Sequence, residues 1–136
     1  MRVVFDSNIF ISAFAIPGGQ AEKAMSRIIE GKDTLLISKE ILDELLSTLA
    51  RKFSHNIEAL SQVAVSLTEI AEMIKTRKRL KVFKDDPDNR VLECALAGSA
   101  DLIVTGDKEM LGLKSYEGIR IISLRGYLET KVRSSS

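Results

Sequence analysis

The sequence has few of the residue types on which several classes of protein depend. Cys94 is the only cysteine, which excludes an internal disulfide framework and fits a reducing, cytoplasmic compartment. Tryptophan is absent and aromatic residues make up only 5% of the chain, so the core must be aliphatic. No apolar run approaches the roughly 20 residues that a membrane helix needs, and no basic region followed by a long apolar run opens the chain. We therefore expect neither a membrane span nor a signal peptide.

The residues that are present are typical of one globular domain. The chain has 136 residues, of which 45% are hydrophobic and 29% are charged. The net charge of +1 does not by itself indicate a nucleic-acid partner. No internal repeat, low-complexity tract or linker divides the chain, so we predict a single domain over residues 1–130. Residues 131–136, which end in three serines, are expected to form a frayed tail.

Apolar runs of strand length alternate with helical patterns along the chain. The expected strands are Arg2–Phe5, Thr34–Ile37, Leu80–Val82, Asp101–Thr105 and Ile119–Ile122. The expected helices lie within residues 38–53, 59–74 and 89–98, where apolar residues recur at steps of three and four. Because the strands are apolar throughout and separated by helices, the pattern predicts an α/β fold, a three-layer α/β/α sandwich around a parallel sheet of four to five strands.

Acidic residues follow the expected strands at the points where those strands end. Asp6 comes directly after the first strand, and Asp107 follows the strand that ends in Thr105. Further acids lie just before or within the neighbouring helices, namely Asp85, Asp86, Asp88, Glu40, Asp43 and Glu44. Sites of open parallel sheets lie outside the carboxyl ends of the strands, so we expect these carboxylates to converge there.

Such convergence has a chemical consequence. Carboxylates held within a few ångströms raise one another's pKa, and a divalent cation removes that conflict. Oxygen ligands without histidine or cysteine favour Mg²⁺ or Mn²⁺ over Zn²⁺. A site of this kind suits phosphodiester hydrolysis, because the metal activates a water and offsets charge on the phosphate oxygens.

Helix capping is the competing interpretation of the same acids. Asp6, Asp88 and Asp107 each precede or begin an expected helix, where aspartate caps the first turn and complements the helix dipole. Asp86-Pro87 is typical of an N-cap followed by the first helical residue. For any one of these residues taken alone capping is the simpler account, but the convergence of separate segments on one edge favours a site.

Three stretches in order resemble the PIN domain family, specifically its VapC-like branch of toxin ribonucleases. They are "VVFDSNIFISA", "ILDELLSTL" and "DDPDNRVLECALAGSADLIVTGDKEML". The resemblance runs from Met1 to about Leu128. It implies a PIN-like fold and a metal-dependent ribonuclease that acts on RNA, works with a cognate antitoxin protein and forms a homodimer.

The resemblance also implies roles for individual residues. The family's acidic quartet falls on Asp6, Glu44, Asp88 and Asp107, with Mg²⁺ or Mn²⁺ as the metal. Helical phase does not separate Asp43 from Glu44, and only the family pattern selects Glu44. Asp86 is the reserve for Asp88. The resemblance further assigns supporting roles to Asn8 and Thr105 and makes Arg90 a candidate for phosphate contact.

A basic run, "KTRKRLKVFK", precedes the third acidic group. Such a run is often a solvated helix end, but without the acidic quartet the count of acidic residues falls from 19 to 15 against 20 basic residues. That balance favours a polyanionic substrate. Arg77, Lys78 and Arg79 are therefore candidate RNA contacts.

Two other classes of protein place an aspartate after the first strand. A haloacid-dehalogenase-like phosphatase needs a second aspartate where this chain has Asn8, and its late acidic motif is absent after Asp107. A receiver-like domain needs an acidic doublet after its first strand and a lysine after its last, and neither is visible. A catalytically silent module that binds RNA or a protein partner on the same fold stays an open alternative.

Overall fold

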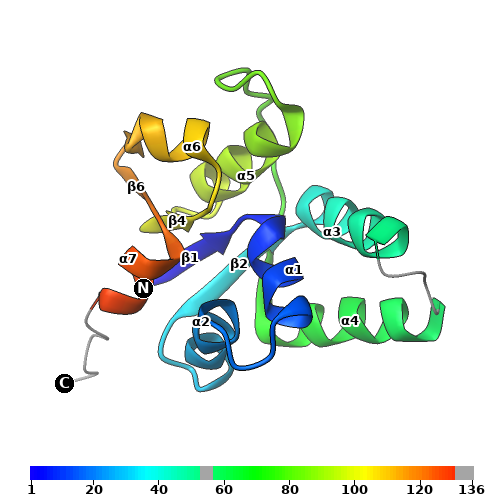
Figure 1. The fold of residues 1–136 in the computed structure, drawn as a ribbon. Coiled ribbons are helices and arrows are strands. Elements are labelled where there is room, and N and C mark those ends of the chain that lie inside the picture. The colour runs from blue at the N-terminus through cyan, green and yellow to red at the C-terminus, as the bar shows by residue number, and fades with distance from the viewer. Residues whose placement is uncertain (53–56, 131–136) are drawn as a thin grey trace.

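The computed structural model describes residues 1–52 and 57–130 and shows a six-stranded sheet (Figure 1). The strands are β1 (Arg2–Phe5), β2 (Thr34–Ser38), β3 (Ala71–Ile74), β4 (Leu102–Val104), β5 (Ser115–Tyr116) and β6 (Ile119–Ile122). Their order across the sheet is β3-β2-β1-β4-β6-β5. All neighbours pair in parallel except the short β5, which pairs antiparallel with β6. The predicted α/β class and parallel central sheet are confirmed.

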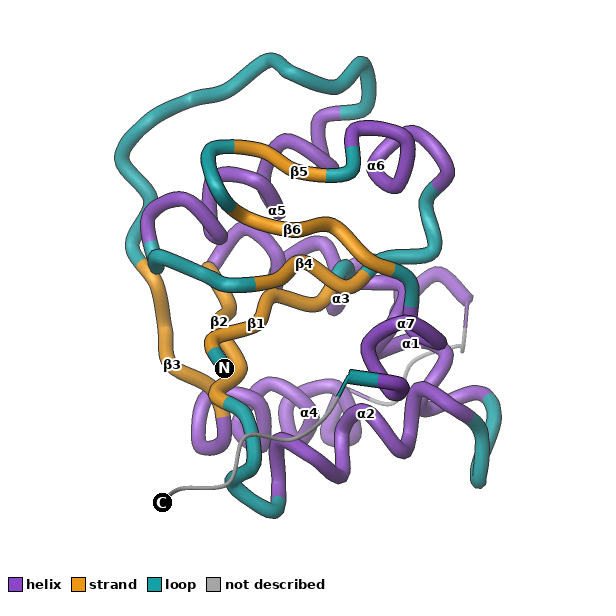
Figure 2. Tube along the Cα trace, turned by 90° about the vertical axis from the view of Figure 1, so that its left-hand side faces the viewer, coloured by secondary structure: helices purple, strands orange, loops and turns teal. Residues whose placement is uncertain are grey.

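Seven helices of the described chain connect and cover these strands. They are α1 (Ser7–Ala15), α2 (Gln20–Ile29), α3 (Lys39–Lys52), α4 (Ile57–Ile70), α5 (Asp86–Ala97), α6 (Lys108–Leu113) and α7 (Leu124–Glu129). Figure 2 shows α5 over one face of the sheet and α2 and α4 over the other. None of the helices in the described residues is long and apolar enough to cross a membrane.

The core is aliphatic, as the composition predicts. The central residues of β1, β2 and β4 are fully buried in one hydrophobic cluster, including Val4, Leu36 and Ile103. Cys94 of α5 is fully buried among them, and burial raises the pKa of its thiol to about 12. Phe5 adds two ring contacts, a tilted one with Phe10 and an edge-on one with Tyr127. The hydrophobic packing of these layers fixes where each strand ends.

A second set of contacts fastens α7 to the rest of the domain. The hydroxyl of Tyr127 donates to Asp33 at 2.5 Å, and the terminal amine of Met1 donates to the other oxygen of the same carboxylate at 2.8 Å. Arg27 of α2 lies over the Tyr127 ring and donates to three carbonyl oxygens at the end of α7. The Tyr127 hydroxyl and the Met1 amine together satisfy the Asp33 carboxylate, which is buried.

Two of the predicted elements are wrong. The helix predicted to continue to Ile74 ends at Ile70, and the next four residues form the edge strand β3 beside β2. The predicted strand at Leu80–Val82 is an irregular segment. Its backbone N–H groups are taken by side chains of α5, since Leu80 donates to Glu93 and Val82 donates to Asn89, so no strand neighbour is needed. The predicted tail at 131–136 lies outside the described residues.

Candidate metal-binding active site

The sheet places two acidic residues side by side at its carboxyl edge. Asp6 directly follows β1, and Asp107 follows the neighbouring β4, which pairs with β1 in parallel. Thr105 links them, because its hydroxyl donates to Asp6 Oδ2 at 2.9 Å and its oxygen accepts the backbone N–H of Asp107 at 3.0 Å. Thr105 is fully buried, so this bridge lies beneath the surface of the site.

Asp88 comes to the same place from a third element. It is the third residue of α5, and it is 95% buried despite its charge. Its Oδ2 atom has no hydrogen-bond partner among the described residues. A buried carboxylate oxygen without a partner is costly, so this atom is poised for a ligand that the protein itself does not supply.

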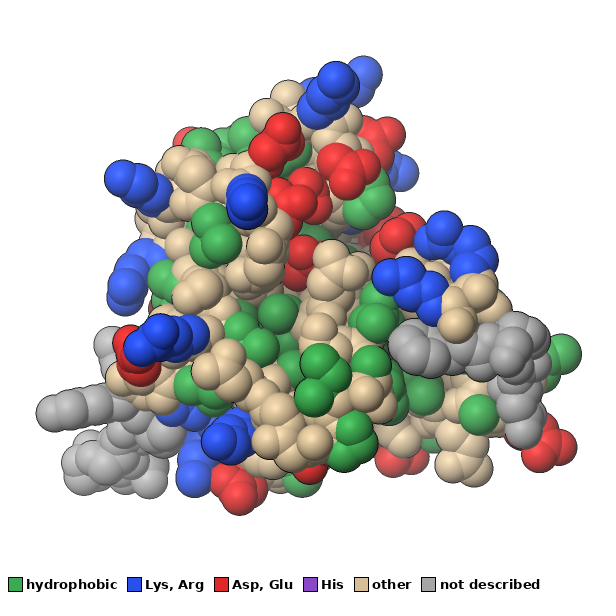
Figure 3. Space-filling model, in the orientation of Figure 1, with side chains coloured by type: hydrophobic (Ala, Val, Ile, Leu, Met, Phe, Trp, Pro, Cys, Tyr) green, Lys and Arg blue, Asp and Glu red, His purple; other side chains and the backbone are tan. Residues whose placement is uncertain are grey.

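Asp88 and Asp107 line an open hollow of about 800 Å³, which we call the acidic groove. Asp6 does not line it but is buried and joined to Asp107 through Thr105. The residues that line it are Asn8, Lys84, Asp85, Asp88, Gly106, Asp107, Lys108 and Glu109. In Figure 3, acidic side chains gather in the upper part of the face, over the region where Figure 1 draws α6 and the start of α5. Lys84 ends the basic run noted in the sequence, whereas Lys108 and Glu109 were not singled out, because only their position on the rim identifies them.

The electrostatics of the acidic groove follow from this crowding. Burial, and after it the charges of Asp107, Asp6, Asp85 and Glu109, together raise the pKa of Asp88 to about 7. The pKa of Asp6 is also raised, first by burial and then by Asp107, although the Thr105 hydroxyl and nearby N–H groups act in the opposite direction. A local positive charge would relieve both carboxylates.

Helix capping explains only part of this arrangement. Asp107 does cap α6, since its Oδ1 accepts the backbone N–H of Met110 at 3.0 Å. Asp6 occupies the N-cap position of α1 but its side chain makes no capping hydrogen bond. At α5 the N-cap is Asp85 rather than the predicted Asp86, and Asp88 lies inside the first turn. Two of the three acids are therefore not accounted for by capping.

Glu44 lies in α3 beside a second hollow of about 390 Å³. That hollow is lined by Ser7, Glu40, Ile41, Asp43, Glu44, Arg79, Asp86, Pro87, Arg90 and Val91. Glu44 is half-buried and accepts a hydrogen bond from Thr48 at 3.4 Å, whereas Asp43 is exposed and paired with Lys39. Ser7 links this hollow to Asp6, because it lines the hollow and its hydroxyl donates to Asp6 Oδ1 at 3.5 Å. Glu44 thus lies in a different recess from Asp88 and Asp107.

The remaining candidates occupy different surroundings. Asn8 is exposed on the rim of the acidic groove. Arg90 is largely buried, paired with Glu93 at 2.8 Å, and its Nε atom has no partner among the described residues. Arg79 borders the Glu44 recess, with its guanidinium 3.9 Å from Glu93. Arg77 and Lys78 are exposed and line a third hollow.

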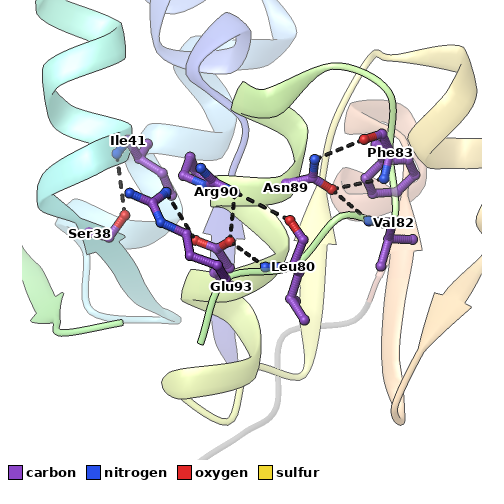
Figure 4. Close-up of polar contacts among 9 residues, drawn as sticks. Ser38, Ile41, Leu80, Val82, Phe83, Asn89, Arg90 and Glu93 are labelled. Carbon is purple, nitrogen blue, oxygen red and sulfur yellow. Dashed lines mark hydrogen bonds and ion pairs between the residues drawn. The ribbon is translucent and has the colours of Figure 1, made fainter. Parts of the chain in front are cut away.

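Two structural residues next to the site were missed by sequence reasoning. Figure 4 shows Asn89 and Glu93 of α5 pointing toward the segment 80–83. Asn89 accepts the N–H groups of Val82 and Phe83 and donates to the Phe83 carbonyl, all at 2.8–3.0 Å. The sequence does hold a signal for these two residues, because Asn89 and Glu93 stand among apolar residues of α5 and are buried with them. Buried polar side chains need hydrogen-bond partners within the protein.

The donor set fits a divalent cation. It consists of carboxylates with raised pKa values and one buried oxygen without a partner, and these oxygens suit Mg²⁺ or Mn²⁺. In the described part of the chain, no three Asp, Glu, His or Cys side chains are already arranged as a metal-binding cluster. Asp88 and Asp107 therefore line one groove with Asp6 buried near them, and the three side chains do not converge on one point.

By class, the protein is an α/β domain that carries three aspartates at the carboxyl edge of its parallel sheet. Comparison with known proteins gives its family. The model of the PIN domain matches residues 2–109. The chain belongs to the PIN domain family.

Two relatives set the range of similarity. The chain is 30% identical over 118 residues to an uncharacterized protein of Methanocaldococcus jannaschii, covering 84% of this chain and 76% of that protein. The structure of this chain is similar to the crystal structure of VapBC2 from Rickettsia felis bound to a DNA fragment from their promoter. In that comparison the TM-score is 0.64, the identity is 16%, and the match covers 90% of this chain and 98% of the other. The structural likeness confirms the fold.

Proposed function

We propose that this protein is a metal-dependent endoribonuclease that hydrolyses phosphodiester bonds of RNA. The observation that carries the proposal is the buried Asp88 Oδ2 atom, which has no hydrogen-bond partner in the described chain. The nearby charges of Asp107 and Asp6 also raise the pKa of this carboxyl group. Membership in the PIN domain family supports a nuclease. The acidic groove is open, which suits a polymer better than a small enclosed substrate.

The roles of the residues follow from their surroundings. Asp6, Asp88 and Asp107 hold Mg²⁺ or Mn²⁺, which when bound lowers the pKa of a water and offsets charge on the phosphate oxygens. Thr105 keeps Asp6 oriented through its hydroxyl, and Asn8 supports the rim. Glu44 takes a proton from the attacking water or positions it from the adjoining recess. Arg90, Arg79, Arg77 and Lys78 are the candidate contacts to RNA.

The proposal extends to the protein partners of the nuclease. The resemblance to VapC-like toxins, together with the fold shared with a VapBC2 structure, supports a toxin that assembles with a cognate antitoxin protein and acts as a homodimer. The single, deeply buried cysteine supports residence in the cytoplasm.

Cleavage of a mixed RNA substrate tests the proposal. Wild-type protein is incubated with Mg²⁺ or Mn²⁺, with and without EDTA, beside Asp6→Asn and a surface control, Glu30→Gln at the C-cap of α2. We expect cleavage by wild type and the control that EDTA abolishes, and at least a hundredfold loss in Asp6→Asn. Normal cleavage by Asp6→Asn would refute the assignment. Absence of cleavage by the wild type, with metal binding intact, would favour the catalytically silent module.

A further inference from the structure

A third hollow, which we call the basic pocket, shares the segment after β3 with the Glu44 recess, which Arg79 of that segment lines. It measures about 660 Å³ and is lined by Lys75, Arg77, Lys78, Leu80, Glu93, Leu96, Ala97, Tyr116 and Glu117. Residues 75–80, which follow β3, thus form one wall, α5 forms the floor, and the β5 edge forms the opposite wall. The segment from Lys75 to Lys84 runs past all three hollows.

The free charge of the basic pocket is positive. Lys75, Arg77 and Lys78 are exposed, and none of the ion pairs in residues 1–52 and 57–130 involves them. Glu93 is already satisfied, because it accepts the Leu80 N–H at 2.8 Å and pairs with Arg90 at 2.8 Å. The exposed Glu117 offsets one of the three cations, so the balance stays positive. By contrast, four acids and only two lysines line the acidic groove. Of these hollows, the basic pocket is the one suited to an anion without help from a metal.

The basic pocket also offers an apolar wall. Leu80, Leu96 and Tyr116 are half-buried and pack against the core, so they present fixed surfaces. Tyr116 is held by the turn between β5 and β6, where Glu117 and Gly118 both have positive φ angles, as a tight two-residue hairpin requires. Cations beside an aromatic ring are the combination that binds a nucleotide, with the phosphate on the cations and the base against the ring.

The end of the segment after β3, at residues 80–83, is held in place before any ligand arrives. Asn89 binds the backbone of Val82 and Phe83, and Glu93 binds the backbone of Leu80 (Figure 4). These bonds come from α5, the same helix that carries Asp88, so the pocket and the acidic groove share one rigid support. Binding to a surface that is already ordered avoids the cost of fixing a mobile loop.

We propose that the basic pocket binds one nucleotide of a single-stranded RNA at a distance from the bond that is cleaved. Lys75, Arg77 and Lys78 hold its phosphate groups, and Tyr116 contacts its base. The choice of RNA as the strand rests on the proposed nuclease function, whereas the pocket itself rests on its own charges and walls. The pocket therefore contributes affinity and register, not chemistry.

RNA binding without cleavage tests the pocket separately from the nuclease. Fluorescence polarisation of a labelled single-stranded RNA is measured in EDTA over a range of salt concentrations. The variants are the triple change Lys75→Ala, Arg77→Ala, Lys78→Ala, the single change Tyr116→Leu, and a control triple with equal charge loss, Lys23→Ala, Lys52→Ala, Arg125→Ala. None of the control residues lines a described hollow. Circular dichroism confirms that each variant is folded.

We expect the pocket triple to lower affinity at least tenfold more than the control triple and to reduce the salt-dependence slope by about 2. Tyr116→Leu should lower affinity about fivefold or more and leave that slope unchanged. Equal losses in both triples, wild-type affinity in Tyr116→Leu, or no RNA binding by the wild type would each overturn the proposal. Pocket-dependent binding in a protein that never cleaves RNA would leave the pocket standing and refute only the nuclease.

Discussion

Thr105 and Asp6 are 99 positions apart in the sequence and are joined by a hydrogen bond of 2.9 Å between the threonine hydroxyl and Asp6 Oδ2. The bond forms because β1 and β4 are parallel neighbours whose carboxyl ends lie together. Through the same oxygen atom, Thr105 also accepts the N–H of Asp107. One buried side chain thereby sets the orientation of one acid and the backbone of another.

Replacement of Thr105 by valine should impair the site more than the fold. The shape is kept, but Asp6 and the Asp107 N–H each lose a buried partner, which costs about 1–3 kcal/mol of stability. Loss of an orienting hydrogen bond to a metal ligand typically reduces metal affinity or activity about 10- to 100-fold, and we expect that range for RNA cleavage. Thr105→Ser, which keeps the hydroxyl, should retain most activity. Equal cleavage by the valine and serine variants would show that the hydroxyl has no role.

The raised pKa of Asp88 predicts that the metal-free protein loses stability as the pH rises. The pKa is about 7 in the folded protein against an ordinary value of 3.8, so between these values the folded state holds a proton that the unfolded state releases. The free energy of unfolding should therefore fall through that window, by up to roughly 4 kcal/mol at about 1.36 kcal/mol per pKa unit. The raised pKa of Asp6 acts in the same direction.

Urea unfolding in EDTA at about pH 5 and about pH 8 measures this effect. Asp88→Asn cannot ionise, so its stability should change less between the two pH values than that of the wild type. The control is Asp43→Asn, whose carboxylate is exposed on α3. An identical pH dependence in wild type and Asp88→Asn would show that Asp88 is not the group responsible.

The pair Asp43 and Glu44 offers a direct choice between neighbouring acids. Glu44 is half-buried in the recess beside Ser7, whereas Asp43 is exposed and paired with Lys39. Glu44→Gln should reduce cleavage at least tenfold, the usual scale for loss of a general base or water-positioning group. Asp43→Asn should stay within about twofold of wild type, because an exposed ion pair contributes little. The reverse ranking in a steady-state cleavage assay would move the assignment to Asp43.

Tyr127 tests the contacts that fasten α7. Its buried hydroxyl donates to Asp33, so Tyr127→Phe leaves that carboxylate with the Met1 amine as its remaining hydrogen-bond donor. We expect a loss of about 1–3 kcal/mol in thermal or urea unfolding, with cleavage by the folded protein unchanged. Tyr116→Phe, in which a half-exposed hydroxyl is removed, is the matched control. Equal stability of Tyr127→Phe and wild type would show that the buried hydrogen bond adds nothing.

The central strands and the acids at their ends could be predicted because they follow strong local rules. A run such as "VVF" is apolar throughout, as a strand buried on both faces must be, and the aspartate that follows marks the carboxyl edge. Parallel neighbours then bring Asp6 and Asp107 together without any further information. The position of the third acid, Asp88, depends on the start of α5 at Asp86-Pro87, and the sequence also indicates that helix start.

The features that could not be predicted from the sequence depend on contacts between distant segments. Ile74 continues the apolar period of α4, so nothing local marks the change to a strand, and only pairing with β2 makes one. Leu80–Val82 has a strand-like sequence, but Asn89 and Glu93 take its backbone donors. Glu44 and Asp43 could not be separated by helical phase, since the difference between them lies in what each side chain faces. Tertiary context overrides local propensity in each case.

Titration of Mn²⁺ into metal-free protein at about pH 8, where the carboxylates are ionised, tests the central claim most directly. Isothermal calorimetry is run on the wild type, on Asp88→Asn and on the surface control Glu30→Gln. The account predicts saturable binding by the wild type and the control, and a loss of at least tenfold in affinity for Asp88→Asn. Unchanged binding by Asp88→Asn, or no binding by the wild type, would contradict the claim that these carboxylates share a metal ion.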